Sequence, residues 1–312
     1  MTHLSSTLVY YNIPDMTPFP RRHFLAAALS AAALPARADG KFRVVASFSI
    51  LADLVAQVGG EAVTVTALVG PDQDLHSYEP RPSDIQAVAG AELLVVNGLG
   101  VEGWTARIAK AAGLRRAPVV ASRGVVPRKG AAGTAEQGET DPHAWQSVPN
   151  VERYVANIRD ALVAADPMHA VLYQANATTY LAQLAALDAD IRAAYAPIPR
   201  SARRIVTTHD ALGYYAATYG LDILAPQGMS TESEPSARDF ANLIRQIRTQ
   251  HIRALFLENV SPATLVKQLS QETSVKIGGT LYDDALSPPD GPAGSYIAMM
   301  RYNTGMITAV LR

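Results

Sequence analysis

Three histidines and a pair of aspartates stand out in this sequence of 312 residues because each lies in a short polar segment of the kind that forms a loop. They are His76, His143, His209 and the pair Asp283-Asp284. Imidazole nitrogens and carboxylate oxygens bind first-row divalent metals, and four of them can enclose one ion. About 66 to 75 residues separate each position from the next, so no local motif such as H-E-x-x-H is present. The residues predict one metal site only if the fold brings four loops together.

Each of these residues also has an ordinary structural interpretation. A single histidine in a loop is more often hydrogen-bonded or exposed than bound to a metal. The run Asp141-Pro142-His143 could be a turn, Asp210 could cap a helix, and Asp283-Asp284 could be a solvated pair. Two further histidines, His169 in a helical pattern and His251 before a strand, are not expected to be ligands.

Composition excludes several other kinds of site. The chain has no cysteine, which excludes disulfides, iron–sulfur clusters, cysteine-ligated zinc and a lipid-anchored cysteine. With 48% hydrophobic and 18% charged residues, it is typical of a folded globular protein. A formal net charge of −1 without basic blocks argues against a nucleic-acid partner.

Residues 1–38 are typical of an export signal. Arg21-Arg22 precede an alanine-rich apolar run, and Ala36-Arg37-Ala38 matches an A-x-A cleavage pattern. The order Arg-Arg-x-Phe-Leu resembles a twin-arginine signal, with an ordinary Sec signal or a membrane anchor as alternatives. The apolar run is shorter than the about 20 residues that a bilayer requires. We therefore expect export, cleavage near Ala38 and a mature chain that is not membrane-embedded.

The elements that must position the four segments alternate between strand and helix. In the first half, apolar stretches predict strands at Phe42–Phe48, Ala62–Val69, Ala91–Asn97 and Ala117–Ala121, and helices over 50–58, from 81 and over 102–112. In the second half, strands are expected at Arg204–Thr208, Leu221–Ala225, Ala254–Glu258 and Val275–Ile277, with helices over 212–219, 235–250, 261–272 and 297–311. This alternation predicts parallel sheets covered by helices, which bind ligands at the carboxyl ends of their strands.

Two stretches between the halves have their own character. Residues 122–142 are polar and glycine-rich and predict a long loop that leads to His143, after which Asn150 is expected to cap a helix that ends at residue 164. A longer helix then begins at Asp166-Pro167, because buried-type residues recur every three or four positions as far as Tyr195. About 30 residues at about 1.5 Å each give a rod of about 45 Å, long enough to span two lobes.

The predicted fold class is therefore α/β, with two parallel-sheet βα lobes joined by one long rigid helix and a metal site in the inter-lobe cleft. The expected organisation is a signal peptide at 1–38, an N-terminal lobe at 39–165, a linker helix at 166–197 and a C-terminal lobe at 198–312.

Five segments taken together resemble the zinc- and manganese-binding solute-binding proteins of bacterial ABC metal importers. They are residues 70–80, 96–102, 141–145, 208–214 and 281–286, and the resemblance extends from about residue 41 to the end. It implies that His76, His143 and His209 are three metal ligands, and that Asp284 is the fourth in preference to Asp283. It also implies a monomeric periplasmic receptor with no catalytic residue, which delivers Zn²⁺ to an ABC permease and its ATPase and could receive it from a metallochaperone.

Two departures from the family pattern bear on the metal. Many zinc-specific members have a histidine-rich acidic loop before the second ligand, whereas here residues 122–142 offer only Glu136, Glu139 and Asp141. Members that favour manganese often have glutamate where this chain has His209. A set rich in nitrogen favours zinc, so we expect Zn²⁺, with Mn²⁺ as the alternative.

A secreted zinc hydrolase is the rival function. A catalytic zinc keeps an open position and needs a nearby base, for which Glu258 is the best candidate, although a structural ion pair is the more ordinary role for it. Four protein ligands would leave no open position. Asp210, Asp141, Glu79 and Trp145 are instead expected to orient the imidazoles as neighbours of the ligands.

Overall fold

The computed structural model describes residues 40–130, 137–232, 235–250 and 252–312. The predicted export signal, together with Glu136 and His251, lies outside these residues. The description below concerns the compact unit Lys41–Arg312.

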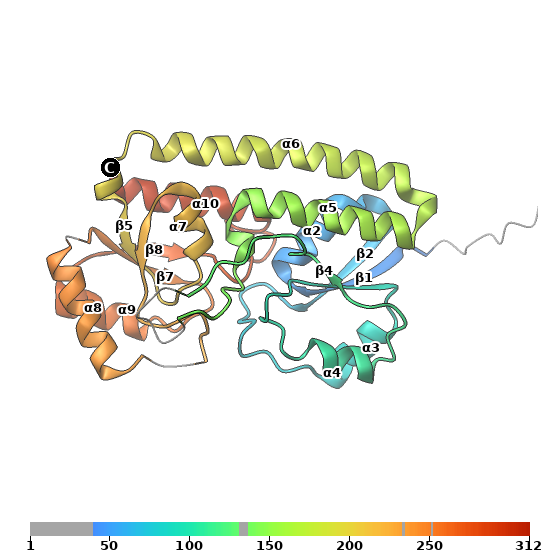
Figure 1. The fold of residues 1–312 in the computed structure, drawn as a ribbon, viewed down its shortest axis with the longest axis horizontal. Coiled ribbons are helices and arrows are strands. Elements are labelled where there is room, and N and C mark those ends of the chain that lie inside the picture. The colour runs from blue at the N-terminus through green and yellow to red at the C-terminus, as the bar shows by residue number, and fades with distance from the viewer. Residues whose placement is uncertain (1–39, 131–136, 233–234, 251) are drawn as a thin grey trace, which may run out of the picture. The chain divides into compact units, whose positions relative to one another are not determined.

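The N-terminal lobe is built on a parallel four-stranded sheet in the order β2-β1-β3-β4 (Figure 1). Side chains alternate across β1, so that Val44 and Ala46 join the core on one face while Val45 joins a second core on the other. Helices α3 and α4 cover that second face, and α2 and α5 cover the first. The strands are β1 Phe42–Phe48, β2 Val63–Val69, β3 Leu93–Val96 and β4 Val119–Val120, and the helices are α2 Ser49–Gly59, α3 Pro82–Ala89, α4 Thr105–Ala111 and α5 Val148–Ala165.

The C-terminal lobe repeats this plan with a parallel sheet in the order β6-β5-β7-β8. Helices α8 and α9 pack on one face of the sheet, and α7 and α10 contribute to the core on the other. The strands are β5 Arg204–Val206, β6 Asp222–Leu224, β7 Ala254–Glu258 and β8 Ile277–Leu281, and the helices are α7 Gly213–Tyr219, α8 Ala237–Thr249, α9 Thr264–Thr273 and α10 Tyr296–Leu311.

Helix α6, Ala170–Tyr195, lies between the two lobes in the sequence and packs against α2, α5 and α10 (Figure 1). Its buried residues form the stripe that the sequence predicts: Tyr173, Ala177, Tyr180, Leu184, Leu187, Ile191 and Tyr195. They belong to one continuous core that also contains residues of both sheets. The predicted fold class, two parallel-sheet lobes with a long helix between them, is confirmed.

Several predicted boundaries are wrong. Asn150 lies inside α5, which begins two residues earlier because Pro149 is tolerated in a first helical turn. Asp166 does not start α6, since a short 3-10 turn, Pro167–His169, separates it from the helix. Strand β8 begins at Ile277 and not at Val275, and it includes two glycines that gave no strand signal.

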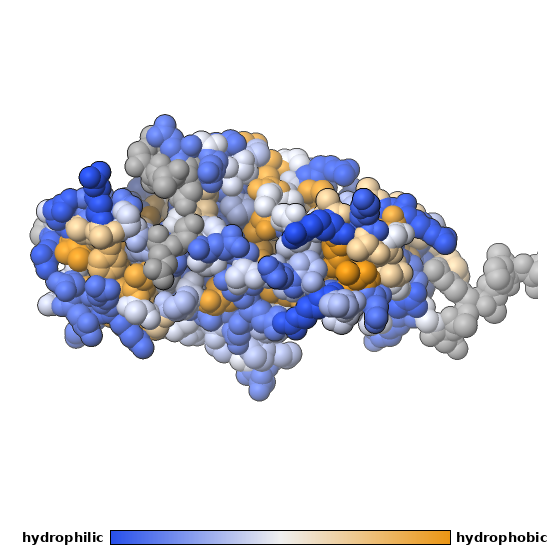
Figure 2. Space-filling model, turned by 90° about the horizontal axis from the view of Figure 1, so that it is seen from below, coloured by the Kyte–Doolittle hydropathy of each residue, from blue (hydrophilic) through white to orange (hydrophobic). Residues whose placement is uncertain are grey.

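Within the described residues, no helix is long and apolar enough to cross a membrane. On the face drawn in Figure 2, hydrophilic residues surround smaller hydrophobic areas. Large apolar side chains that are exposed include Val126, Met168 and Val171.

Candidate metal centre

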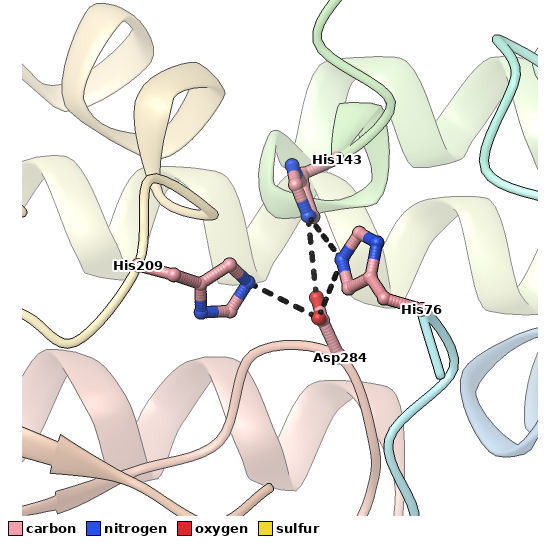
Figure 3. A group of neighbouring side chains, drawn as sticks. All are labelled: His76, His143, His209 and Asp284. Carbon is pink, nitrogen blue, oxygen red and sulfur yellow. Dashed lines mark hydrogen bonds and ion pairs between the residues drawn. The ribbon is translucent and has the colours of Figure 1, made fainter. Parts of the chain in front are cut away.

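The four predicted ligands meet at one point, although they come from four loops (Figure 3). His76 follows β2, and His143 directly precedes the short 3-10 turn that leads into α5. His209 follows β5 and Asp284 follows β8. Their ligand atoms all lie within 4.8 Å of one another. All four loops follow the carboxyl ends of parallel strands, namely β2, β4, β5 and β8, where such sheets bind their ligands.

The distances between these atoms suit a single ion. Asp284 Oδ2 lies 3.1 Å from His76 Nε2 and 3.2 Å from His209 Nε2, and the two Nε2 atoms of His76 and His143 are 3.2 Å apart. Asp284 Oδ1 lies 3.6 Å from His143 Nε2. Zinc–nitrogen bonds of about 2.0–2.1 Å give a tetrahedron with edges of about 3.3–3.4 Å. The printed separations of 3.1–3.6 Å are therefore close to the edges of such a tetrahedron.

Polar atoms at this point have no hydrogen-bond partner among the described residues. They are both carboxylate oxygens of Asp284 and Nε2 of His209, all buried. Polar groups in a folded interior are almost always paired, because leaving one unpaired costs free energy. A bound cation would supply the missing partner for all three atoms, so the site fits a metal ion.

Asp141 orients the His143 ring. Its Oδ1 atom lies 2.8 Å from His143 Nδ1, and its Oδ2 atom accepts a hydrogen bond of 2.9 Å from Arg128 Nη1. Burial alone would raise the pKa of Asp141, but the hydrogen bond and charge of His143, with Arg128, hold that pKa below its usual value. A proton on Nδ1 leaves Nε2 free to bind a metal. This confirms the expectation that Asp141 orients an imidazole.

Glu258 does the same for His209. Its Oε2 atom lies 2.6 Å from His209 Nδ1 and accepts a hydrogen bond from the Ser261 hydroxyl, while its Oε1 atom accepts hydrogen bonds from the backbone N–H groups of Thr208 and His209. Burial would lower the pKa of His209, but Glu258 and Asp284 together hold it well above its usual value in the metal-free protein. Glu258 therefore positions the imidazole of His209, a predicted ligand. The sequence located it at a strand end but not as the neighbour of His209.

The other residues expected to orient imidazoles behave differently. The Trp145 ring packs edge-on against His143, with ring centroids 5.2 Å apart, while its Nε1 donates a hydrogen bond to the Asp283 carbonyl. Trp145 thus supports two ligand segments at once. Glu79 is exposed, and Asp210 bonds through its backbone N–H to the Gly228 carbonyl. Neither carboxylate forms a hydrogen bond with an imidazole in the described part of the chain.

A buried network behind His143 gives the segment 96–102 its role. Asn97 Nδ2 donates a hydrogen bond of 2.9 Å to the carbonyl of Pro142, the residue before His143. Glu102 fixes Asn97 in turn by accepting hydrogen bonds from its backbone N–H and from Gly98 and Ser47. The sequence marked this segment only through the family resemblance, because no local pattern shows that it reaches residue 142.

Comparison with known proteins points to one family. Residues 44–310 match the family model of ZnuA, the zinc-uptake complex component A, periplasmic. The iron-binding protein YfeA of Yersinia pestis is 32% identical over 277 residues, which cover 88% of this chain and 87% of YfeA. The manganese-binding lipoprotein MntA of Halalkalibacterium halodurans is 35% identical over 266 residues, 85% of this chain and 87% of MntA. The structure of the periplasmic zinc-binding protein TroA from Treponema pallidum superposes with a TM-score of 0.81 and 30% identity, over 87% of this chain and 99% of TroA.

Proposed function

Because the chain belongs to the ZnuA family of substrate-binding proteins of ABC metal importers, we propose that it captures Zn²⁺ in the periplasm. Members of this family are receptors and not enzymes, so the chain is a metal-binding receptor and the secreted hydrolase is set aside. The observation that carries the proposal is the meeting of His76, His143, His209 and Asp284 within 4.8 Å.

The donor set supports zinc as the cargo. Three imidazole nitrogens and one carboxylate lie at the spacing of a zinc tetrahedron. Zinc binds such nitrogen-rich sites more strongly than manganese or ferrous iron does. The glutamate that often accompanies manganese preference is replaced here by His209.

Manganese is the second candidate, and one observation favours it. Both oxygens of Asp284 face the imidazoles, with Oδ2 near His76 and His209 and Oδ1 near His143. A bidentate carboxylate would raise the number of ligand atoms to five, which suits ions that prefer more oxygen and higher coordination. Relatives named for iron and for manganese match 88% and 85% of this chain.

A competition titration tests the choice of metal. Metal-free protein is titrated with Zn²⁺ and with Mn²⁺ against chelators of known affinity, each alone and then both together. We expect Zn²⁺ to bind more tightly and to displace Mn²⁺ completely. Tight Mn²⁺ binding beside weak Zn²⁺ binding would reverse the assignment, and failure to bind either metal would remove the proposed site.

The rest of the proposal follows from this role. The receptor would work as a monomer that hands its metal to a permease driven by an ATPase, with a metallochaperone as a further candidate partner. Export by the segment 1–38 with cleavage near Ala38 would place it in the periplasm. The proposed organisation is an N-terminal lobe at 39–165, a linker helix at 166–197 and a C-terminal lobe at 198–312.

A further inference from the structure

The segment that carries His76, residues 70–80, belongs to the N-terminal lobe but is hydrogen-bonded to the C-terminal one. The backbone N–H of Asp72 donates to the carbonyl of Leu286, at 3.0 Å, just beyond the ligand Asp284. Asn259 Nδ2 donates to Asp72 Oδ1 at 2.8 Å. The Thr231 hydroxyl donates to Asp74 Oδ2 at 2.7 Å. Three hydrogen bonds thus link this loop of the N-terminal lobe to residues of the C-terminal lobe.

Asp74 is the member of this set closest to the metal centre. Its Oδ1 atom accepts a 2.8 Å hydrogen bond from the backbone N–H of His76 itself. Its Oδ2 atom accepts hydrogen bonds from Thr231 and, at 3.1 Å, from the Ser77 hydroxyl of the same loop. One carboxylate therefore joins the backbone of a ligand to a residue of the opposite lobe.

His76 is also the ligand through which solvent can reach the site. Its side chain is 6% exposed, whereas those of His143, His209 and Asp284 are 0% exposed. The three buried ligands are held by carboxylates or by packing within the core. A metal can leave the site with the least rearrangement if His76 moves. For the His76 backbone to move, either its own hydrogen bond to Asp74 or the hydrogen bond from Thr231 to Asp74 must break.

We propose that Asp74 and Thr231 form a latch that sets how long the bound metal stays. The inference rests on the proposed function, because it concerns the same site. Both are positioning residues, since neither contacts the metal. The hydrogen bond from Thr231 must break for His76 and its loop to move away from the site, so losing it is expected to raise the dissociation rate while the coordinating atoms stay the same.

The test compares variants that remove hydrogen bonds to the same oxygen atom from different lobes. Thr231→Val removes the hydroxyl from the opposite lobe and keeps the side-chain shape. Thr231→Ser keeps the hydroxyl, and Ser77→Ala removes the donor that belongs to the loop itself. Protein loaded with Zn²⁺ is mixed rapidly with an excess of chelating dye, and the dissociation rate is read from the dye. Unfolding temperatures of the metal-free proteins report on folding.

We expect Thr231→Val to release zinc about tenfold faster, the effect of losing one hydrogen bond to a carboxylate. Thr231→Ser should return the rate to that of the wild type, and Ser77→Ala should change it by less than about twofold, because that bond does not cross between lobes. A Thr231→Val rate equal to the wild-type rate would overturn the latch, as would an equal acceleration by Ser77→Ala. A wild-type protein that binds no metal would overturn the proposed function and the latch with it.

Discussion

Each fully buried imidazole of the site has a carboxylate behind it. Asp141 holds His143, and Glu258 holds His209. In the described part of the chain, no carboxylate lies behind the His76 ring in this way, and His76 is fixed instead through its backbone by Asp74. The two buried rings are therefore oriented before a metal arrives, while the third depends on the loop that carries it.

Asp284 is the proposed metal ligand and the adjacent Asp283 is not, and substitution of each should distinguish the two. Asp284→Asn is expected to weaken zinc binding by roughly 100-fold or more, because it removes the anionic ligand. Asp283→Asn should change the affinity by less than about tenfold. Burial, with the nearby Glu258 and Asp284, raises the pKa of Asp283 well above its usual value, which favours its uncharged form. Chelator competition measures both variants, and equal losses would contradict the choice of Asp284.

The third histidine should decide the choice between metals. We predict that His209→Glu shifts the ratio of zinc to manganese affinities toward manganese, since it exchanges a nitrogen ligand for an oxygen ligand. Circular dichroism should show an unchanged fold. If both affinities fell in the same proportion, the argument that His209 selects zinc would be lost even though the site survived.

Glu258 should control how zinc binding depends on pH. The pKa of His209 lies well above its ordinary value of about 6.5 in the metal-free protein, so zinc must displace a proton from it wherever the pH is below that raised pKa. Affinity should therefore rise by about tenfold per pH unit across this range. Glu258→Gln should lower the affinity by about 10- to 100-fold and flatten the pH dependence, because the proton is then held less tightly. A pH profile parallel to that of the wild type would rule out this coupling.

The same raised pKa has a consequence for folding with a definite sign. Because folded His209 holds its proton more tightly than the unfolded chain does, the stabilisation is complete below pH of about 6.5 and is lost as the pH rises through the folded pKa. Glu258→Gln should make the free energy of unfolding of the metal-free protein fall less as the pH rises. Urea unfolding at neutral and alkaline pH, with chelator present, measures this free energy for both proteins.

Among the secondary-structure elements, α6 was the most predictable, because its apolar residues recur with helical spacing along its whole length. The residue at which α6 starts could not be predicted, since Asp166-Pro167 can begin either an α-helix or the 3-10 turn found here. Strand β8 was partly missed because Gly278-Gly279 interrupts its apolar run, although a side chain at these positions would collide with Phe256 and Met306. Neither strand order could be derived from spacing, because pairing between strands depends on contacts distant in the sequence.

The site was predictable to a similar degree. The residue types and their loop positions suggested one metal site between the lobes, and the family resemblance identified which residues would be its ligands. The carboxylate behind His143 is two residues away in the sequence and was found. The one behind His209 is 49 residues away, and its strand-end position alone did not identify its partner.

The buried stripe of α6 should contribute more to stability than its exposed face does. Leu184→Ala is expected to lower the free energy of unfolding by about 2–5 kcal/mol, because it leaves a cavity in the core. The adjacent exposed Gln183→Ala should change it by less than about 0.5 kcal/mol. Chemical denaturation of the two metal-free proteins gives the comparison. Similar losses in the free energy of unfolding for the two variants would contradict a larger contribution from the buried stripe.

For the molecule as a whole, the decisive feature is that both lobes and α6 share one continuous core. Packed cores resist continuous deformation. We therefore predict that metal binding moves the lobes little and acts mainly on loops. Small-angle X-ray scattering with Zn²⁺ and with chelator should give radii of gyration that agree within about 1 Å, in contrast to the wide closure of hinged receptors. A clear contraction on binding would contradict the rigid-helix model.

Trp145 gives the protein an optical reporter of its own cargo. Its indole ring lies against the ligand His143 and its N–H is bonded beside Asp284, whereas the other tryptophan, Trp104, packs against Tyr78 in the N-terminal lobe. A cation on His143 alters the electric field at the first indole much more than at the second. We therefore expect intrinsic fluorescence, without any attached dye, to follow the arrival and departure of the ion at the level of a single side chain.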